Sequence, residues 1–115
     1  MQTTPRFLNG VYAFHGTGLA TPAPVTPALS YTVASDKRSQ MIYLRAGNSA
    51  DAMIAVHLVR GGKPFRSFPI GAQGAIHVSL AVVEDLEPDS SLDVVVAAPE
   101  GVSGHVVLDI GFMEI

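Results

Sequence analysis

The chain has 115 residues, a usual length for one domain, and it has no cysteine, which excludes disulfides, zinc–thiolate centres and thiol nucleophiles. Its net charge is −3 with only seven Lys and Arg, so no basic stripe exists for phosphate groups and nucleic acid is not an expected partner. No segment approaches the ~18 consecutive apolar residues of a membrane span, and the first residues lack the apolar stretch of a signal peptide. We therefore expect a protein that is cytoplasmic or belongs to a particle assembled in the cytoplasm.

Charge is scarce for so small a domain. Charged residues make up 15% of the chain, against about 25% in typical soluble domains, and the mean hydropathy is +0.34. A domain of this size that water covered on all sides would carry more charge. The composition therefore predicts that a partner, either a second copy of the chain or a larger protein assembly, covers part of the surface.

The first 28 residues are predicted to form an N-terminal strand followed by a proline-rich arm. Pro22, Pro24 and Pro27 follow one another closely in this region. Each proline removes a backbone donor from a possible ladder and favours extended, polyproline-like backbone. We therefore separate residues 1–28 from the domain that follows them.

Residues 29–115 are predicted to form an antiparallel β-sandwich of the jelly-roll or immunoglobulin-like kind. Alternating apolar residues dominate this part of the chain, and clusters of Gly, Pro, Asp and Ser interrupt them about every 8 to 12 residues, as in sandwiches and barrels. The expected strands cover residues 29–34, 40–46, 52–60, 64–69, 74–80, 91–98 and 103–115. With the N-terminal strand, the all-β fold has about eight strands.

Each expected strand has two faces, because side chains alternate sides along a strand. One set is assigned to the core: Ile42, Leu44, Ile54, Val56, Leu58, Ile76, Val78, Leu80, Leu92, Val94, Val96, Val106, Leu108, Ile110 and Phe112. The opposite set is more apolar than a solvated sheet face usually is: Met41, Tyr43, Met53, Ala55, Val59, Val95, Ala97, Val107 and Met113. The arm could cover this outward set, its apolar residues could simply be scattered over the surface, or the set could dock on another protein.

We adopt the docking interpretation and name interface candidates. The apolar candidates are Tyr43, Met53, Val59, Val95, Val107 and Met113. Arg66 joins them because it lies between Phe65 and Phe68 and could stack on a sugar or a base, although such a side chain often covers neighbouring apolar surface instead.

The same alternation assigns three histidines to outward positions on different strands. His57, His77 and His105 are these residues, and Asp109 follows His105 on the same face. Imidazoles and a carboxylate that converge from neighbouring strands can bind a divalent transition metal, as in cupin-type jelly rolls. Because the chain has no closely spaced histidine pair, no cofactor is the main expectation and this metal set is a minor alternative.

The segment VVEDLEPDSSLDVVVAAPEGVSGHVVLDIGF, roughly the last third of the chain, resembles the ending of small jelly-roll or immunoglobulin-like decoration and head-spike proteins of phage-like particles. In those proteins a turn with an acidic-proline step precedes two closing strands. The resemblance implies a symmetric, non-catalytic module that is bound to a shell or fibre by its N-terminal arm. It assigns no functional residue.

These observations support one main functional hypothesis and two alternatives. No serine lies in a nucleophile elbow and no catalytic constellation is visible, so the main hypothesis is a non-catalytic assembly module that acts through self-association and docking. The first alternative is a module that binds a glycan or small ligand, although only Tyr12, Tyr31 and Tyr43 offer rings with a polar group and Trp is absent. The second is a metal-dependent, cupin-like enzyme.

Overall fold

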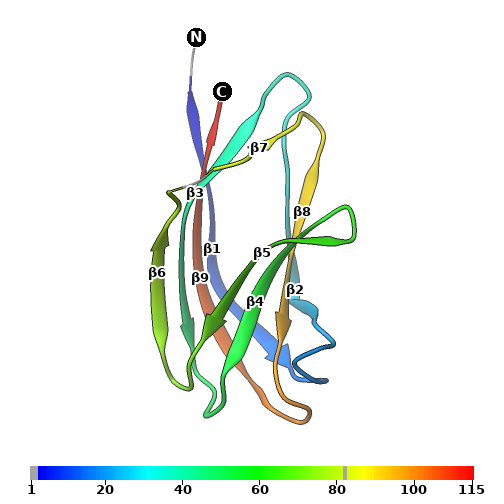
Figure 1. The fold of residues 1–115 in the computed structure, drawn as a ribbon, viewed down its shortest axis with the longest axis vertical. Helices are drawn as coiled ribbons and strands as arrows, with labels where there is room; N and C mark the ends of the chain where they lie inside the picture. The colour runs from blue at the N-terminus through cyan, green and yellow to red at the C-terminus, as the bar shows by residue number, and fades with distance from the viewer. Residues whose placement is uncertain (1–2, 82) are drawn as a thin grey trace.

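The computed structural model describes residues 3–81 and 83–115 as a sandwich of antiparallel strands (Figure 1). The strands are β1 Thr4–His15, β2 Ala23–Thr32, β3 Ser39–Asn48, β4 Ile54–Arg60, β5 Lys63–Ile70, β6 Ala75–Ser79, β7 Asp85–Leu86, β8 Ser91–Ala97 and β9 Ser103–Glu114. The predicted all-β sandwich is confirmed. In the part of the chain that the structure describes, no helix is long and apolar enough to cross a membrane.

The strands form two sheets that share one continuous path of pairing. Sheet A has the order β6-β3-β9-β1, with the short β7 paired to β3, and sheet B has the order β5-β4-β8-β2. The sheets connect where Ala13 of β1 lies opposite Thr26 of β2. Strand β2 reaches this position because its register with β8 shifts between Pro24 and Leu29. Sheet B thus passes into sheet A at a β-bulge-like irregularity.

The segment predicted as a separate strand and arm is part of the sandwich. Strand β1 pairs with β9 over all twelve of its residues, and β2 begins at Ala23, so the expected boundary at residue 28 falls inside a strand. Pro24 and Pro27 both lie in β2. Prolines are tolerated here because β2 runs at the margin of sheet B and has one registered pair with β1, so few backbone donors are required on that side.

The core confirms most of the inward assignments. These predicted core residues are buried: Leu44, Ile54, Val56, Leu58, Leu92, Val94, Val96, Val106, Leu108, Ile110 and Phe112. Ile76, Val78 and Leu80, on and beside the edge strand β6, are partly buried and pack against this core. Ala97 was assigned outward but is buried.

The assignment of Met41 and Ile42 was wrong because β3 contains a bulge. Met41 lies opposite Phe112 of β9 and Tyr43 lies opposite Gly111, so Ile42 is an extra residue in the ladder. A bulge exchanges the faces of the residues on one side of it. Met41 is accordingly 1% exposed and Ile42 is 40% exposed.

A buried carboxylate joins four strands of both sheets. Glu114 of β9 is 3% exposed, and its Oε2 accepts a hydrogen bond of 2.7 Å from the Tyr31 hydroxyl of β2. Its Oε1 forms an ion pair of 3.1 Å with Nε of Arg6 on β1. The Tyr31 hydroxyl also lies 2.9 Å from Oγ of Ser39 on β3, and its ring stacks on Phe112 at 4.4 Å. A buried charge with these partners is compensated rather than orphaned.

Hydrogen bonding and burial shift the pKa values of this pair in opposite directions. The Tyr31 hydrogen bond, with Arg6, holds the pKa of Glu114 below its ordinary value of 4.5, although burial opposes this shift. Burial raises the pKa of Tyr31 to about 12, and the neighbouring Glu114 adds to that shift. The stabilisation from Glu114 is therefore complete above pH 4.5 and is lost as the pH falls through the lower folded pKa.

Replacing the carboxylate with its amide tests this contact. We expect Glu114→Gln to lower the free energy of unfolding by about 1 kcal/mol at pH 7, because a charge-assisted bond is exchanged for a neutral one. As the pH falls through the lowered pKa of Glu114, the two proteins should differ less, because the wild-type carboxylate becomes protonated. Urea unfolding over a pH series from 7 downward measures the difference, and a difference that does not shrink anywhere below pH 4.5 contradicts the assignment.

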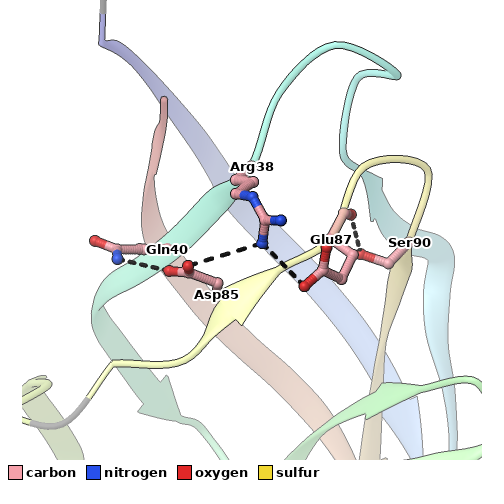
Figure 2. A network of polar contacts seen from close by, with 5 residues as sticks. All are labelled: Arg38, Gln40, Asp85, Glu87 and Ser90. Carbon is pink, nitrogen blue, oxygen red and sulfur yellow. Dashed lines mark hydrogen bonds and ion pairs between the residues drawn. The ribbon is translucent and has the colours of Figure 1, made fainter.

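A second polar network holds the short strand β7 against β3 (Figure 2). Arg38 Nη1 lies 3.0 Å from Glu87 Oε1 and 4.0 Å from Asp85 Oδ2, while Gln40 Nε2 donates to Asp85 Oδ1 at 2.7 Å. These groups are exposed, so the ion pairs contribute at most about 1 kcal/mol each. Leu86, which lies opposite Ser39 and is buried, contributes more to holding the segment, since burying a leucine is worth about 2 kcal/mol.

Candidate functional site

The structure distributes the predicted interface residues over two opposite faces. Tyr43, Val107 and Met113 lie on the outer face of sheet A, on β3 and β9. Val59 and Val95 lie on the outer face of sheet B and line a depression of about 340 Å³ there. These residues therefore do not form one continuous surface.

The remaining two interface candidates lie outside both groups. Met53 is exposed in the connection before β4. Arg66 of β5 is engaged within the chain: its guanidinium lies 4.9 Å from the Phe65 ring centroid and its Nη1 lies 3.4 Å from Glu84. Arg66 thus covers a neighbouring ring, which was the alternative weighed for it.

The histidines proposed for a metal are not brought together. His57 lies on β4 of sheet B, where its Nδ1 is 2.7 Å from Oγ of Ser67. His77 and His105 lie on β6 and β9 of sheet A, with β3 between them. Across residues 3–81 and 83–115, no group of three or more histidine or acidic side chains is arranged to hold a metal ion. The alternation of side chains predicts which face of a strand each histidine occupies. The distance between the histidines depends on strand order, which alternation does not predict.

The outer face of sheet A is organised in three rows that cross its four strands, because residues directly opposite in antiparallel strands point to the same side. The polar row is His77, Arg45, Asp109 and Asn9; the aromatic row is Ser79, Tyr43, Gly111 and Phe7; the apolar row is Ala75, Gly47, Val107 and Val11. The polar row lies between the other two. Each row thus takes one residue from β6, β3, β9 and β1 in turn.

The Tyr43 ring lies over the backbone of the neighbouring strand. A Cβ atom at Gly111 would collide with the ring, so glycine is the residue type that lets the Tyr43 ring lie over β9 at this position. The Tyr43 hydroxyl donates a hydrogen bond of 2.9 Å to Oδ1 of Asp109. Burial, together with this bond, raises the pKa of Tyr43 above its ordinary value. The neutral hydroxyl is therefore fixed at the boundary between the aromatic and the polar row.

Two further polar groups surround the same ring. The Arg45 guanidinium lies 5.3 Å from the Tyr43 ring centroid, and the His77 ring meets it edge-on at 6.3 Å. Arg45 Nη1 is 4.0 Å from Oδ2 of Asp109, which is too long for a hydrogen bond. The guanidinium and the carboxylate are thus close together but can each bond a third, polar group.

The apolar side chains exposed by the fold are concentrated on this face. Phe7, Val11, Ile42 and Val107 are four of the eight large hydrophobic side chains that are exposed among the described residues, and all four lie on sheet A. Beside the polar row, Gly47 and Ala75 leave a shallow depression of about 380 Å³. A surface that joins an apolar ring platform to hydrogen-bonding groups is typical of a ligand site.

Several residues of this face were not singled out from the sequence. Arg45 could have been found, because it is two positions from Tyr43 and therefore on the same face. Asn9 and Phe7 could not, since only the pairing of β1 with β9 places them beside Asp109 and Gly111.

Substituting Gly111 tests the position of the ring. We expect Gly111→Ala to displace Tyr43, to cost about 1 to 3 kcal/mol of stability through overpacking, and to return the pKa of Tyr43 toward 10. Urea unfolding and a spectrophotometric tyrosine titration measure the two effects. Gly71→Ala is the matched control, because a Cβ there meets no atom within 4 Å. Equal behaviour of the two variants would show that the ring does not depend on Gly111.

Comparison with known proteins gives structural similarity only. No protein-family model matches the chain, and no curated protein matches it either. A carbohydrate-binding module, the CBM36-1 domain of a multidomain xylanase from the hindgut metagenome of Trinervitermes trinervoides, superposes with a TM-score of 0.60 at 18% identity, covering 96% of each chain. A CBM36 carbohydrate-binding module in complex with calcium and xylotriose gives a TM-score of 0.57 at 18% identity, covering 98% of each chain.

These similarities correct the main functional hypothesis. The expectation of a structural module acting through self-association and docking is wrong in the light of full-length structural neighbours that are carbohydrate-binding modules. The first alternative, a module that binds a glycan or small ligand, stays a proposal. The neighbour solved with calcium shows that a protein of this fold binds a divalent cation. The predictions of a homo-oligomer and of a phage-like relative stay predictions.

Proposed function

We propose that this chain is a non-catalytic glycan-binding module whose binding surface is the outer face of sheet A. The observation that carries the proposal is the Tyr43 ring, which lies over Gly111 and is flanked by the exposed guanidinium of Arg45 and the half-buried carboxylate of Asp109. A second ring, Phe7, occupies the same row on the far side of Gly111 and is 57% exposed. The chain thus compensates for its lack of tryptophan by placing two smaller rings in one row.

The two rows match the two kinds of surface that a sugar presents. The C–H face of a pyranose is apolar and packs on aromatic rings, which in this protein are those of Tyr43 and Phe7. Its hydroxyl groups both donate and accept hydrogen bonds, and Asp109 accepts while Arg45 donates. Bonds to these charged groups are about twice as strong as bonds between neutral groups. The rows extend across four strands, a width of about 14 Å, which favours an oligosaccharide over a single sugar.

Calcium does not fit this surface as a bridging ion. Ca²⁺ takes six to eight oxygen ligands, with carboxylates prominent among them. The polar row contributes one carboxylate, Asp109, whose oxygens already face the Tyr43 hydroxyl and the Arg45 guanidinium. We therefore propose that the glycan is bound directly by the side chains of the polar and aromatic rows.

Calorimetric titration with xylotriose, cellotriose and longer β-linked oligosaccharides, selected from a glycan array, tests the proposal. We expect binding by the native chain, and about tenfold weaker binding by Phe7→Ala and by Arg45→Gln, which corresponds to about 1.4 kcal/mol for each lost contact. Met53→Ala and Lys63→Gln are the matched controls, because both side chains are exposed outside the three rows. The fold of each variant is checked by its melting temperature.

Two outcomes would contradict the proposal. A blank glycan array removes the function altogether, and equal losses in the control variants remove the assignment to sheet A. Titration of the native chain with glycan in the presence of calcium and in the presence of EDTA gives a further measurement. We expect the same affinity in both, because the side chains are proposed to contact the glycan directly, without a bridging cation. A tenfold loss of affinity in EDTA would contradict the assignment of the glycan site to this face.

A further inference from the structure

The depression in the apolar row is held open by a glycine for which the fold has no need. A Cβ added at Gly47 would meet only Val107, at 3.9 Å, which is an ordinary van der Waals contact. Gly47 also has no left-handed backbone conformation, unlike Gly10 and Gly101. A glycine inside a strand weakens that strand, and it often marks a bulge, a tight bend, or a site where a ligand or another backbone approaches closely. The ladder between β3 and β9 is regular at Gly47, and a Cβ there would meet no backbone atom within 4 Å, so the close approach of a ligand is the reason that remains.

The chemistry of the depression limits what it can receive. Its floor is almost wholly apolar and is formed by Gly47, Ala75 and Val107. Arg45, His77 and Asp109 line its rim, and of these three groups the Arg45 guanidinium is a donor that cannot accept a hydrogen bond. A sugar hydroxyl placed on this floor would lose its hydrogen bonds to water, which costs about 1 to 3 kcal/mol. The occupant therefore has an apolar end and an acceptor beside it.

We infer that the depression receives the acetyl group of an acetylated sugar, with the methyl on the Gly47 floor and the carbonyl oxygen accepting from the rim. This inference rests on the proposed glycan-binding function and names the substrate class of the same surface. Gly47 lies four residues from Tyr43 along β3, about 13 Å away. One oligosaccharide can thus stack one residue on Tyr43 and place an acetylated residue over the depression. Both O-acetyl and N-acetyl groups carry the required methyl and carbonyl.

The test compares ligand pairs that differ only in acetylation. O-acetylated xylo-oligosaccharides are titrated before and after mild alkaline deacetylation, and the trimer of N-acetylglucosamine is titrated beside cellotriose, which has the same linkage and a hydroxyl in place of the acetamido group. We expect the acetylated member of at least one pair to bind about tenfold more tightly. The pair that shows this preference identifies the acetyl group as ester-linked or amide-linked.

Filling the depression gives the matching protein variant. Gly47→Val places a side chain on the floor, and we expect it to abolish the preference by weakening only the acetylated ligand; Gly47→Ala, which fits without displacement, should reduce the preference partially. Gly71→Ala is the control and should bind like the native chain. The inference is overturned if the native chain binds glycans without any preference for the acetylated ligand and Gly47→Val binds them with the same affinity. That result leaves the glycan-binding function intact. A chain that binds no member of either pair and no array glycan overturns both.

Discussion

The pairing of β9 with β1 on one side and with β3 on the other is the constraint on which the outer face of sheet A depends. Each of the three rows is a set of directly opposite residues, so each exists only in this register. Asp109 reaches both Asn9 and Arg45 as neighbours, and Gly111 lies between Phe7 and Tyr43, because β9 is the central member of the three strands. A slip of one residue in either ladder would turn the outward side chains of the shifted strand into the core.

Two features hold that register. At the end of the ladders, Glu114 binds Arg6 of β1 and Tyr31 of β2, so the last residues of β9 cannot slide without burying an unpaired charge. Within β3, the bulge at Ile42 changes which residues face inward. Before the bulge Ser39 and Met41 are buried; after it Leu44 and Ala46 are buried, which leaves Tyr43, Arg45 and Gly47 outward. The bulge thus allows a buried polar contact at one end of β3 and the proposed binding face at the other.

The sequence predicted the parts of this fold that depend on local alternation. The apolar residues assigned to the core in β4, β8 and β9 recur with a period of two and are all buried, although Ala97 of β8, assigned outward, is buried as well. The prediction was wrong at Met41 and Ile42, where one extra residue breaks the period, and at Pro24 and Pro27, where the tolerance of a sheet margin for proline outweighs the local preference. Strand order lies beyond alternation, and it separates His57 from the other histidines and places Phe7 beside Gly111.

The low charge of the chain led to the expectation that another protein covers the outward face. The polar row argues for a different occupant. A dry protein interface over sheet A would bury Arg45 and Asp109, whose 4.0 Å separation leaves them without the direct hydrogen bond that a buried ion pair needs to offset the loss of water. A sugar carries its own hydroxyl groups and bridging waters to both charges while it packs its C–H face on Tyr43 and Phe7. An apolar face that is divided by a charged row is therefore better suited to a carbohydrate than to an apolar protein surface.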